Sequence, residues 1–241
     1  MASVVRAGFD LARAGNFPSV ASNVLAALIL ARPLASGALD PQLLALCVVG
    51  GCLTYAGGAT LNDVADAGFD AKHKPERTIP SGVISRGGAA ALGAVEMLAG
   101  LGLLVFAGAS GIWAAALAAT ILAYDWMHKK WAGSVVLMAG CRVLLACALA
   151  SIPGHSIVQP LFLIWIAGLF AYIVTLSLIA RREYQPGAPA AKIGRSVGRL
   201  LAFIPLVDAL ALLLAGAWMP ALACAAAVPL GRWAQRLAAA N

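Results

Sequence analysis

One short segment carries most of the side chains that can do chemistry: Asn62-Asp63-Val64-Ala65-Asp66-Ala67-Gly68-Phe69-Asp70, which follows a long apolar run. In a continuous helix its three aspartates lie three and four residues apart and share one face. Their charges repel one another, so the face favours a cation. Mg²⁺ suits these oxygens, because it keeps several waters and bridges one or two carboxylates to phosphate groups. The spacing predicts Mg²⁺ at Asp63, Asp66 and Asp70. The alternative is an acidic helix end that is simply solvated in a loop.

The elements that position this segment are predicted to be membrane helices. Hydrophobic residues make up 62% of the 241 and charged residues 11%, whereas a soluble domain carries about 25% charged residues. A spanning helix needs about 20 apolar residues. We therefore expect an all-α integral membrane bundle of about eight transmembrane helices, in one domain over residues 1–241. The expected spans are approximately 17–36, 41–62, 88–108, 110–127, 133–153, 158–180, 199–216 and 217–234.

The distribution of basic residues predicts the topology. If the N-terminus is cytoplasmic and each span crosses once, every Lys and Arg falls on the cytoplasmic side except Arg32, outside, and Arg142, within a span. This asymmetry follows the positive-inside rule. It accounts for the net charge of +7 without nucleic-acid binding. We expect a multi-pass protein of the cell inner membrane with both termini cytoplasmic.

The loops suggest two four-helix halves. The long charged loops, 63–87 and 181–198, follow the second and sixth expected spans. The first half then covers helices 1–4, about 17–127, and the second covers helices 5–8, about 133–236. Function is expected on the cytoplasmic face.

Basic residues and a turn follow the acidic segment directly. Lys72, Lys74 and Arg77 precede the turn Ile79-Pro80-Ser81-Gly82. This order suits a lid over a phosphorylated ligand. The alternative is that Lys72 and Arg77 bind no ligand and only follow the rule that cytoplasmic loops are rich in basic residues.

The acidic segment and this turn together resemble the first signature of the UbiA-type intramembrane prenyltransferases. That signature is Asn-Asp-x-x-Asp-x-x-x-Asp at the end of the second helix, followed by Arg-Pro-x-x-Ser-Gly. Here the second part reads Arg77-Thr78-Ile79-Pro80-Ser81-Gly82, with Thr78 where the family usually has proline.

Two further stretches are similar to the family. Arg13-Ala14-Gly15-Asn16-Phe17-Pro18-Ser19, with Asn23 further on, resembles the start of its first helix. Tyr124-Asp125-x-x-His128-Lys129 stands where the family usually has Tyr-Pro-x-x-Lys-Arg. The details from Tyr124 to Arg142 resemble the EboC-like branch.

The resemblance implies Mg²⁺-dependent transfer of a prenyl group from a polyprenyl diphosphate to an aromatic or other lipophilic acceptor in the membrane. Its partners would be these two substrates and membrane lipids. In the family, Mg²⁺ and basic side chains neutralise the departing pyrophosphate, and the apolar walls keep water from the allylic cation. We expect catalytic roles for Asp63, Asp66, Asp70 and Glu183, and substrate binding by Asn23, Asn62, Lys72, Arg77, Tyr124, Lys129, Arg142, Arg181 and Arg182.

The sequence departs from the family where the second acidic cluster should lie, at the end of the sixth helix. Only Glu183 is a carboxylate there, and Arg181 and Arg182 precede it. These arginines either bind diphosphate directly, since a guanidinium matches phosphate oxygens, or anchor the helix end at the headgroups. The loss leaves a second function open, an isoprenoid-lipid carrier with weakened catalysis, and a third, a transporter-like protein.

Glu96, Arg142 and Asp208 fall inside the expected spans, where charge is costly. Glu96 and Arg142 lie at similar depths, so we expect them to pair or to line one cavity. Asp208 follows Pro205. It orients the acceptor, serves as a base that removes a proton after alkylation, or is neutral and hydrogen-bonded within the bundle.

Overall fold

Long helices fill nearly all of the part of the chain that the structure, a computed structural model, describes: residues 4–33, 38–182 and 189–238. A short amphipathic helix, α1, precedes a 3-10 turn, η1, and eight longer helices follow. Their bounds are α1 Val4–Leu11, η1 Ala14–Asn16, α2 Phe17–Leu30, α3 Pro41–His73, α4 Arg86–Phe106, α5 Gly111–Met127, α6 Ser134–Ala150, α7 Pro160–Arg181, α8 Ala190–Leu214 and α9 Trp218–Leu237.

Each of the eight expected spans overlaps one of the helices α2–α9, which confirms the all-α membrane bundle. Among the described residues, α3, α4, α7 and α8 from Lys192 onward are long and apolar enough to cross a membrane, and Ala14–Leu30, α5 and α6 are shorter apolar helices. The two largest differences from the expected bounds are in α3 and α8. Helix α3 continues to His73, and α8 begins at Ala190, because polar sequence can extend a helix beyond the bilayer.

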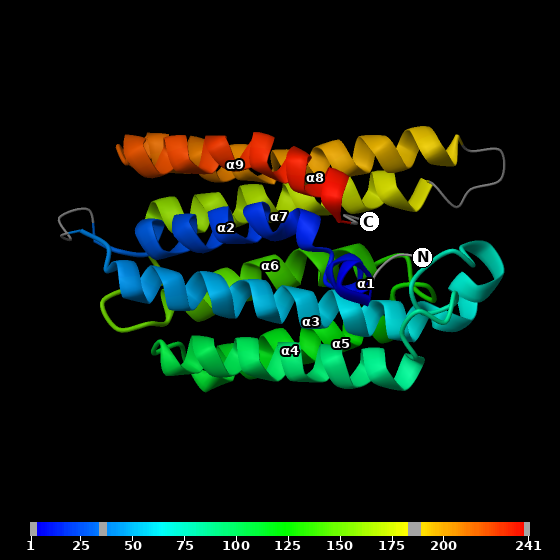
Figure 1. Cartoon of the computed structure of the whole chain (residues 1–241). Helices are drawn as coiled ribbons and strands as arrows, with labels where there is room; N and C mark the ends of the chain where they lie inside the picture. The colour runs from blue at the N-terminus through cyan, green and yellow to red at the C-terminus, as the bar shows by residue number, and fades with distance from the viewer. Residues whose placement is uncertain (1–3, 34–37, 183–188, 239–241) are drawn as a thin grey trace.

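The helices run along one common direction (Figure 1). α8 and α9 form one edge of the bundle and α4 and α5 the opposite edge, with α2, α3, α6 and α7 between them. Helix α2 contacts α3, α6, α8 and α9, so it joins the two expected halves. Helix α1 lies at the same end of the bundle as the last turn of α9.

Capping side chains set where α3 and α4 begin. Asp40 precedes Pro41 and its Oδ1 accepts the backbone N–H of Gln42 at 2.9 Å, which caps α3. Ser85 caps α4 in the same way, with its hydroxyl accepting the N–H of Gly88 at 3.1 Å. Between these two caps, α3 runs without a break through all four polar residues of the acidic segment.

Helices α3 and α4 touch backbone to backbone through glycines. A Cβ added at Gly57 would lie 2.6 Å from the carbonyl oxygen of Gly93, and one added at Gly100 would lie 2.6 Å from that of Gly50. Small residues of this kind let membrane helices approach closely. This contact fixes the long helix that carries the acidic segment.

A polar cluster centred on Asp208 lies within the apolar core. Asp208 is fully buried. It accepts hydrogen bonds from the hydroxyl of Ser22 at 2.6 Å, from Nδ2 of Asn23 at 2.8 Å and from the indole N–H of Trp165 at 2.9 Å. Of the three roles left open for Asp208, these contacts favour that of a residue hydrogen-bonded within the bundle. The cluster ties α2 to α7 and α8.

Arg142 extends this cluster toward α6 and α3. Its guanidinium donates to Oδ1 of Asn23, to the carbonyl of Ser19 at 3.1 Å and to the hydroxyl of Ser19 at 3.0 Å. It also lies 5.4 Å from the centre of the Tyr55 ring. Asn23 therefore bridges a buried cation and a buried carboxylate.

The expected pairing of Glu96 with Arg142 is wrong. Glu96 accepts a hydrogen bond from the hydroxyl of Thr60 at 3.1 Å, while Arg142 is bound by α2. Equal depth fixes a height in the membrane but not the side of the helix to which a residue points.

Replacing Gly100 with Ala should lower the thermal unfolding temperature of the detergent-purified protein. The added methyl forces α3 and α4 apart, and overpacking of this kind costs about 1–3 kcal/mol. Gly102→Ala is the matched control, because no atom lies within 4 Å of its added Cβ. Equal unfolding temperatures for the two variants would contradict the backbone contact.

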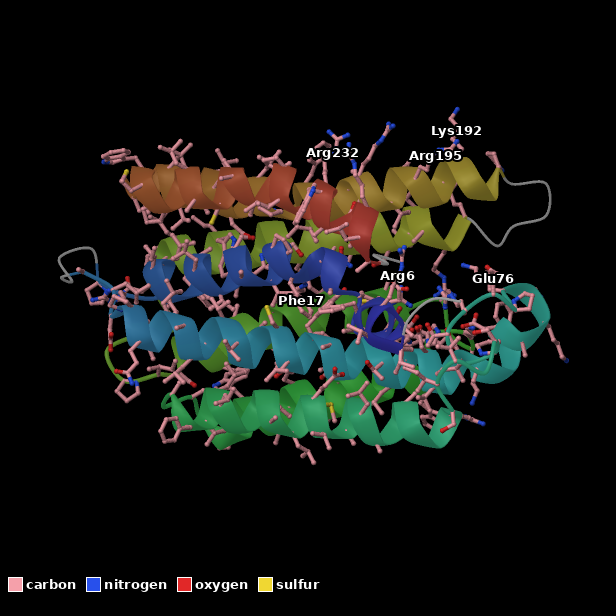
Figure 2. All side chains as sticks on the ribbon, viewed as in Figure 1. Arg6, Phe17, Glu76, Lys192, Arg195 and Arg232 are labelled. Atoms are coloured by element: carbon pink, nitrogen blue, oxygen red, sulfur yellow. The ribbon has the colours of Figure 1, made fainter. Side chains whose placement is uncertain are left out.

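Asp208→Ala should destabilise the protein by about 1–3 kcal/mol, because it leaves the donors of Asn23 and Trp165 buried without an acceptor. Thermal unfolding measures the loss, and Glu76→Ala, an exposed carboxylate that points outward (Figure 2), serves as the control. An Asp208→Ala variant as stable as the control would show that the cluster does not hold the helices together.

Candidate functional site

The acidic segment forms the last three turns of α3, and its carboxylates share one face as the spacing predicted. Because α3 is continuous to His73, Asp63 and Asp66 lie one turn apart and Asp70 lies one turn further. This end of α3 reaches past α4 and α5 at one end of the bundle (Figure 1). Basic side chains from separate segments lie against the face.

Two arginines hold Asp63 and Asp70. The guanidinium of Arg77 lies 2.8 Å from Oδ2 of Asp70 and 3.5 Å from Oδ1 of Asp63. A second guanidinium, from Arg13, donates to Oδ1 of Asp63 at 2.8 Å. Arg77 comes from the loop after α3, which folds back along the helix to bring it there.

Arg13 reaches the site through an unusual backbone conformation. Its φ is 47° and its ψ is 45°, in the left-handed region that costs a non-glycine residue about 1 kcal/mol or more. This turn joins α1 to η1 and aims the side chain at α3. Burial is the largest single effect on Arg13 and lowers its pKa. The charge and hydrogen bond of Asp63, together with nearby Tyr55, outweigh burial and raise the pKa of Arg13 further above its usual value.

Asp66 contacts the end of α5 instead. Its carboxylate lies 3.2 Å from Nε2 of His128 and 2.9 Å from Nζ of Lys129. The ammonium of Lys129 also lies 3.6 Å from the centre of the Phe69 ring, and the ring of Tyr124 stacks on that of His128. Burial lowers the pKa of His128, but the hydrogen bond and charge of Asp66 outweigh it, so the net pKa is raised.

Asn62 binds a carboxylate that was not among the predicted site residues. Its amide nitrogen donates to Oδ1 of Asp125 at 3.1 Å. The other oxygen, Oδ2, is buried and has no hydrogen-bond partner within the described parts of the chain. The signal for Asp125 was its position in the Tyr124-Asp125-x-x-His128-Lys129 stretch, where the family usually has proline.

Arg181 contacts the loop between α5 and α6. Its guanidinium donates to the carbonyl of His128 at 3.1 Å and to the hydroxyl of Ser134 at 3.1 Å. It therefore fixes the loop between α5 and α6, which carries His128 and Lys129. The two expected roles of Arg181, direct diphosphate binding and anchoring at the headgroups, stay predictions beside these contacts.

The remaining predicted residues that the structure describes make no hydrogen bond or ion pair with Asp63, Asp66 or Asp70. Lys72 and Arg182 are exposed, and Glu183 lies outside the described residues. Asn23 and Arg142 belong to the buried cluster around Asp208. That cluster approaches the site through Tyr55, whose hydroxyl accepts a hydrogen bond from Asn16 at 2.9 Å.

The donor set fits Mg²⁺ bound by few protein ligands. No group of three His, Cys, Asp or Glu side chains in the described residues is arranged to hold one metal ion, because basic side chains lie between the aspartates. Mg²⁺ needs only one or two carboxylates, with waters and phosphate oxygens completing its shell. The unpartnered oxygen of Asp125, near Asn62 and Asp66, is the kind of hard donor that it takes.

Comparison with known proteins gives the same family over most of the chain. The sequence profile of the UbiA prenyltransferase family matches residues 20–240. A curated relative, digeranylgeranylglyceryl phosphate synthase of Methanoculleus marisnigri (strain ATCC 35101 / DSM 1498 / JR1), is 41% identical over 68 residues, which are 28% of this chain and 24% of the relative. The match thus spans about a quarter of the relative's length.

The fold is also that of a solved structure. A structure from work on digeranylgeranylglyceryl phosphate synthase in membranes matches 97% of this chain and 95% of its own with a TM-score of 0.63, at 15% sequence identity. Such low identity supports the fold alone. The profile match extends over nearly the whole chain, and on that ground this protein belongs to the UbiA prenyltransferase family.

Proposed function

We propose that this protein transfers a prenyl group from a polyprenyl diphosphate to a lipophilic acceptor in the membrane, with Mg²⁺ bound at the acidic end of α3. Membership of the family supports prenyl transfer in general. The observation that carries the finer proposal is the acidic face of α3, on which Arg13, Arg77, His128 and Lys129 converge at one end of an apolar bundle.

The acidic residues suit a positively charged metal ion, and their basic partners suit the negatively charged diphosphate that the metal would bind. Asp66, Asn62 and Asp125 would hold Mg²⁺, and Asp63 and Asp70 would complete its surroundings. When bound, Mg²⁺ neutralises charge on the departing pyrophosphate. Arg77 and Lys129, now paired with aspartates, would turn to the phosphate oxygens, since guanidinium and ammonium groups bind phosphate strongly.

The chemistry that remains falls to the apolar walls and to the acceptor. The carbon–oxygen bond to pyrophosphate breaks, the acceptor's electron pair forms the new bond to carbon, and the acceptor loses a proton where it carried one. Buried apolar residues hold the prenyl tail and keep water from competing with the acceptor. The curated relative is named for a digeranylgeranylglyceryl phosphate product, so glyceryl phosphate lipids belong among the acceptors tested, beside aromatic ones.

The contacts of Arg181 favour a second candidate, an isoprenoid-lipid carrier with weakened catalysis. The second acidic cluster of the family is missing from the sequence, and the guanidinium of Arg181 is already engaged by His128 and Ser134. A carrier would bind polyprenyl diphosphate with Mg²⁺ and release no pyrophosphate. Pyrophosphate release from the purified protein across prenyl chain lengths and acceptors separates the two functions.

Asp66→Asn should reduce pyrophosphate release by at least about 100-fold while leaving expression and unfolding temperature close to wild type. The amide keeps the shape and still meets Lys129, but it is a poorer ligand for Mg²⁺ than a carboxylate. Glu76→Gln, an exposed residue in the loop after α3, is the control. Turnover by Asp66→Asn at the wild-type rate would remove Asp66 from the metal site.

Arg77→Gln should raise the concentration of polyprenyl diphosphate needed for half-maximal rate by about tenfold or more. This side chain bridges Asp63 and Asp70 and is one of the cations proposed to meet the phosphates. The matched variant is Arg86→Gln, an exposed arginine at the start of α4, which should change nothing. Equal shifts in both variants would mean that Arg77 acts only through surface charge.

A further inference from the structure

Five basic residues lie on the outer edge of the bundle, away from the acidic segment. We call them the α8–α9 basic stripe, and they are Lys192, Arg195, Arg199, Arg232 and Arg236. All five are exposed. Helices α8 and α9 contain one carboxylate between them, the buried Asp208. Within the described residues no ion pair engages the stripe.

The register of α8 and α9 places these residues in one row. Nε2 of Gln235 donates to the carbonyl of Gly198 at 3.1 Å, and a Cβ added at Gly231 would lie 3.9 Å from that of Ala202. The helices are antiparallel (Figure 1). From the membrane interior outward, the order is therefore Arg232, Arg199, Arg236, Arg195 and Lys192. At about 1.5 Å per residue, a cation recurs about every 3–4 Å.

The same register makes the basic residues point to one side. Arg232 follows Gly231 and Arg199 follows Gly198, and both glycines face the other helix. Successive side chains of an α-helix point in directions about 100° apart around the helix axis. Viewed from one end of the bundle, the two antiparallel helices rotate in opposite directions along the sequence. Arg232 and Arg199 therefore point to the same side of the helix pair. Figure 2 shows Arg232, Arg195 and Lys192 along that outer edge, pointing away from the bundle.

The surroundings of the stripe are those of a lipid contact. Trp233 is 60% exposed and Leu230 and Leu237 are also exposed. Trp233 lines a shallow pocket of about 230 Å³ together with Pro229, Arg232 and Arg236. Tryptophan is enriched where hydrocarbon meets headgroups. Counted from Trp218, Arg232 lies about 21 Å along α9 and Arg236 about 27 Å, near the thickness of a hydrocarbon core.

We propose that the α8–α9 basic stripe binds the phosphate headgroup of an anionic phospholipid, whose acyl chains lie along the exposed leucines of α9. The positive-inside rule accounts for basic residues at this end of the helices. It does not account for their alignment on one side, or for a pocket lined by two arginines and a tryptophan. The charge and the apolar rim together match a lipid rather than a soluble anion.

Native mass spectrometry of the full-length protein in neutral detergent tests this proposal. Wild type is titrated with phosphatidylglycerol or phosphatidylcholine, and we expect tighter binding of phosphatidylglycerol. Arg232→Gln/Arg236→Gln should weaken phosphatidylglycerol binding by about 30-fold, which corresponds to about 2 kcal/mol, since each basic residue near an anionic surface contributes about 1 kcal/mol. Phosphatidylcholine binding should not change.

The control is Arg86→Gln/Lys130→Gln, which removes two exposed cations outside the stripe and should keep wild-type binding. Arg199→Gln, on the other helix, should lose affinity by about fivefold, and it serves if the α9 variant does not fold. An equal loss in the control variant, or equal affinity of wild type for both lipids, would overturn the proposal. So would displacement of the lipid by inorganic phosphate at millimolar concentration, which would indicate a soluble anion.

Discussion

Three carboxylates lie on one face of α3 at one end of an apolar bundle. They can remain charged there only if cations lie against them, because like charges in a poorly hydrated environment repel strongly. Much of the local structure at this end serves that constraint. Arg13 adopts a left-handed backbone to reach Asp63. The loop after α3 returns Arg77 to Asp70, and α5 ends where His128 and Lys129 meet Asp66. Charge neutralisation thus shapes the site before any ligand is bound.

A second polar layer lies beneath the first and has a different task. Asp208 and Arg142 are both buried, and Asn23 stands between them, accepting from the cation and donating to the carboxylate. Since buried polar groups in a membrane must be satisfied within the protein, this arrangement fixes the relative positions of α2, α6 and α8. Tyr55 connects the layers, with Arg142 near its ring and Asn16 bound to its hydroxyl. Asn23 and Arg142 therefore support the site rather than form its acidic face.

The helices and the acidic face could be predicted from the sequence, because apolar length and i,i+3 or i,i+4 spacing are local properties. The partners of the aspartates could not, since they depend on where distant segments fold. Arg13 was noted only as part of a stretch that resembles the family, and the residues around it gave no signal for its left-handed backbone. Asp125 stood unassigned beside Tyr124. The predicted pairing of Glu96 with Arg142 was wrong because position along the sequence gives a residue's depth in the membrane but not the direction in which its side chain points. The contacts of Arg181 could not be predicted because its partners are a backbone carbonyl and a serine, which carry no charge.

The cations at the acidic face differ in how freely they can change partners. The side chains of Arg77 and Lys129 are 21% and 32% exposed, whereas those of Arg13 and His128 are 16% and 14% exposed. Arg13 is further fixed by its turn, and His128 by the ring of Tyr124 and by the loop that Arg181 holds. Under the proposed function, Arg77 and Lys129 are therefore the two expected to turn toward a phosphate group, while the less exposed Arg13 and His128 would keep Asp63 and Asp66 in place. The aspartates that lose these partners would then need another cation, and in the proposed function Mg²⁺ would supply that positive charge.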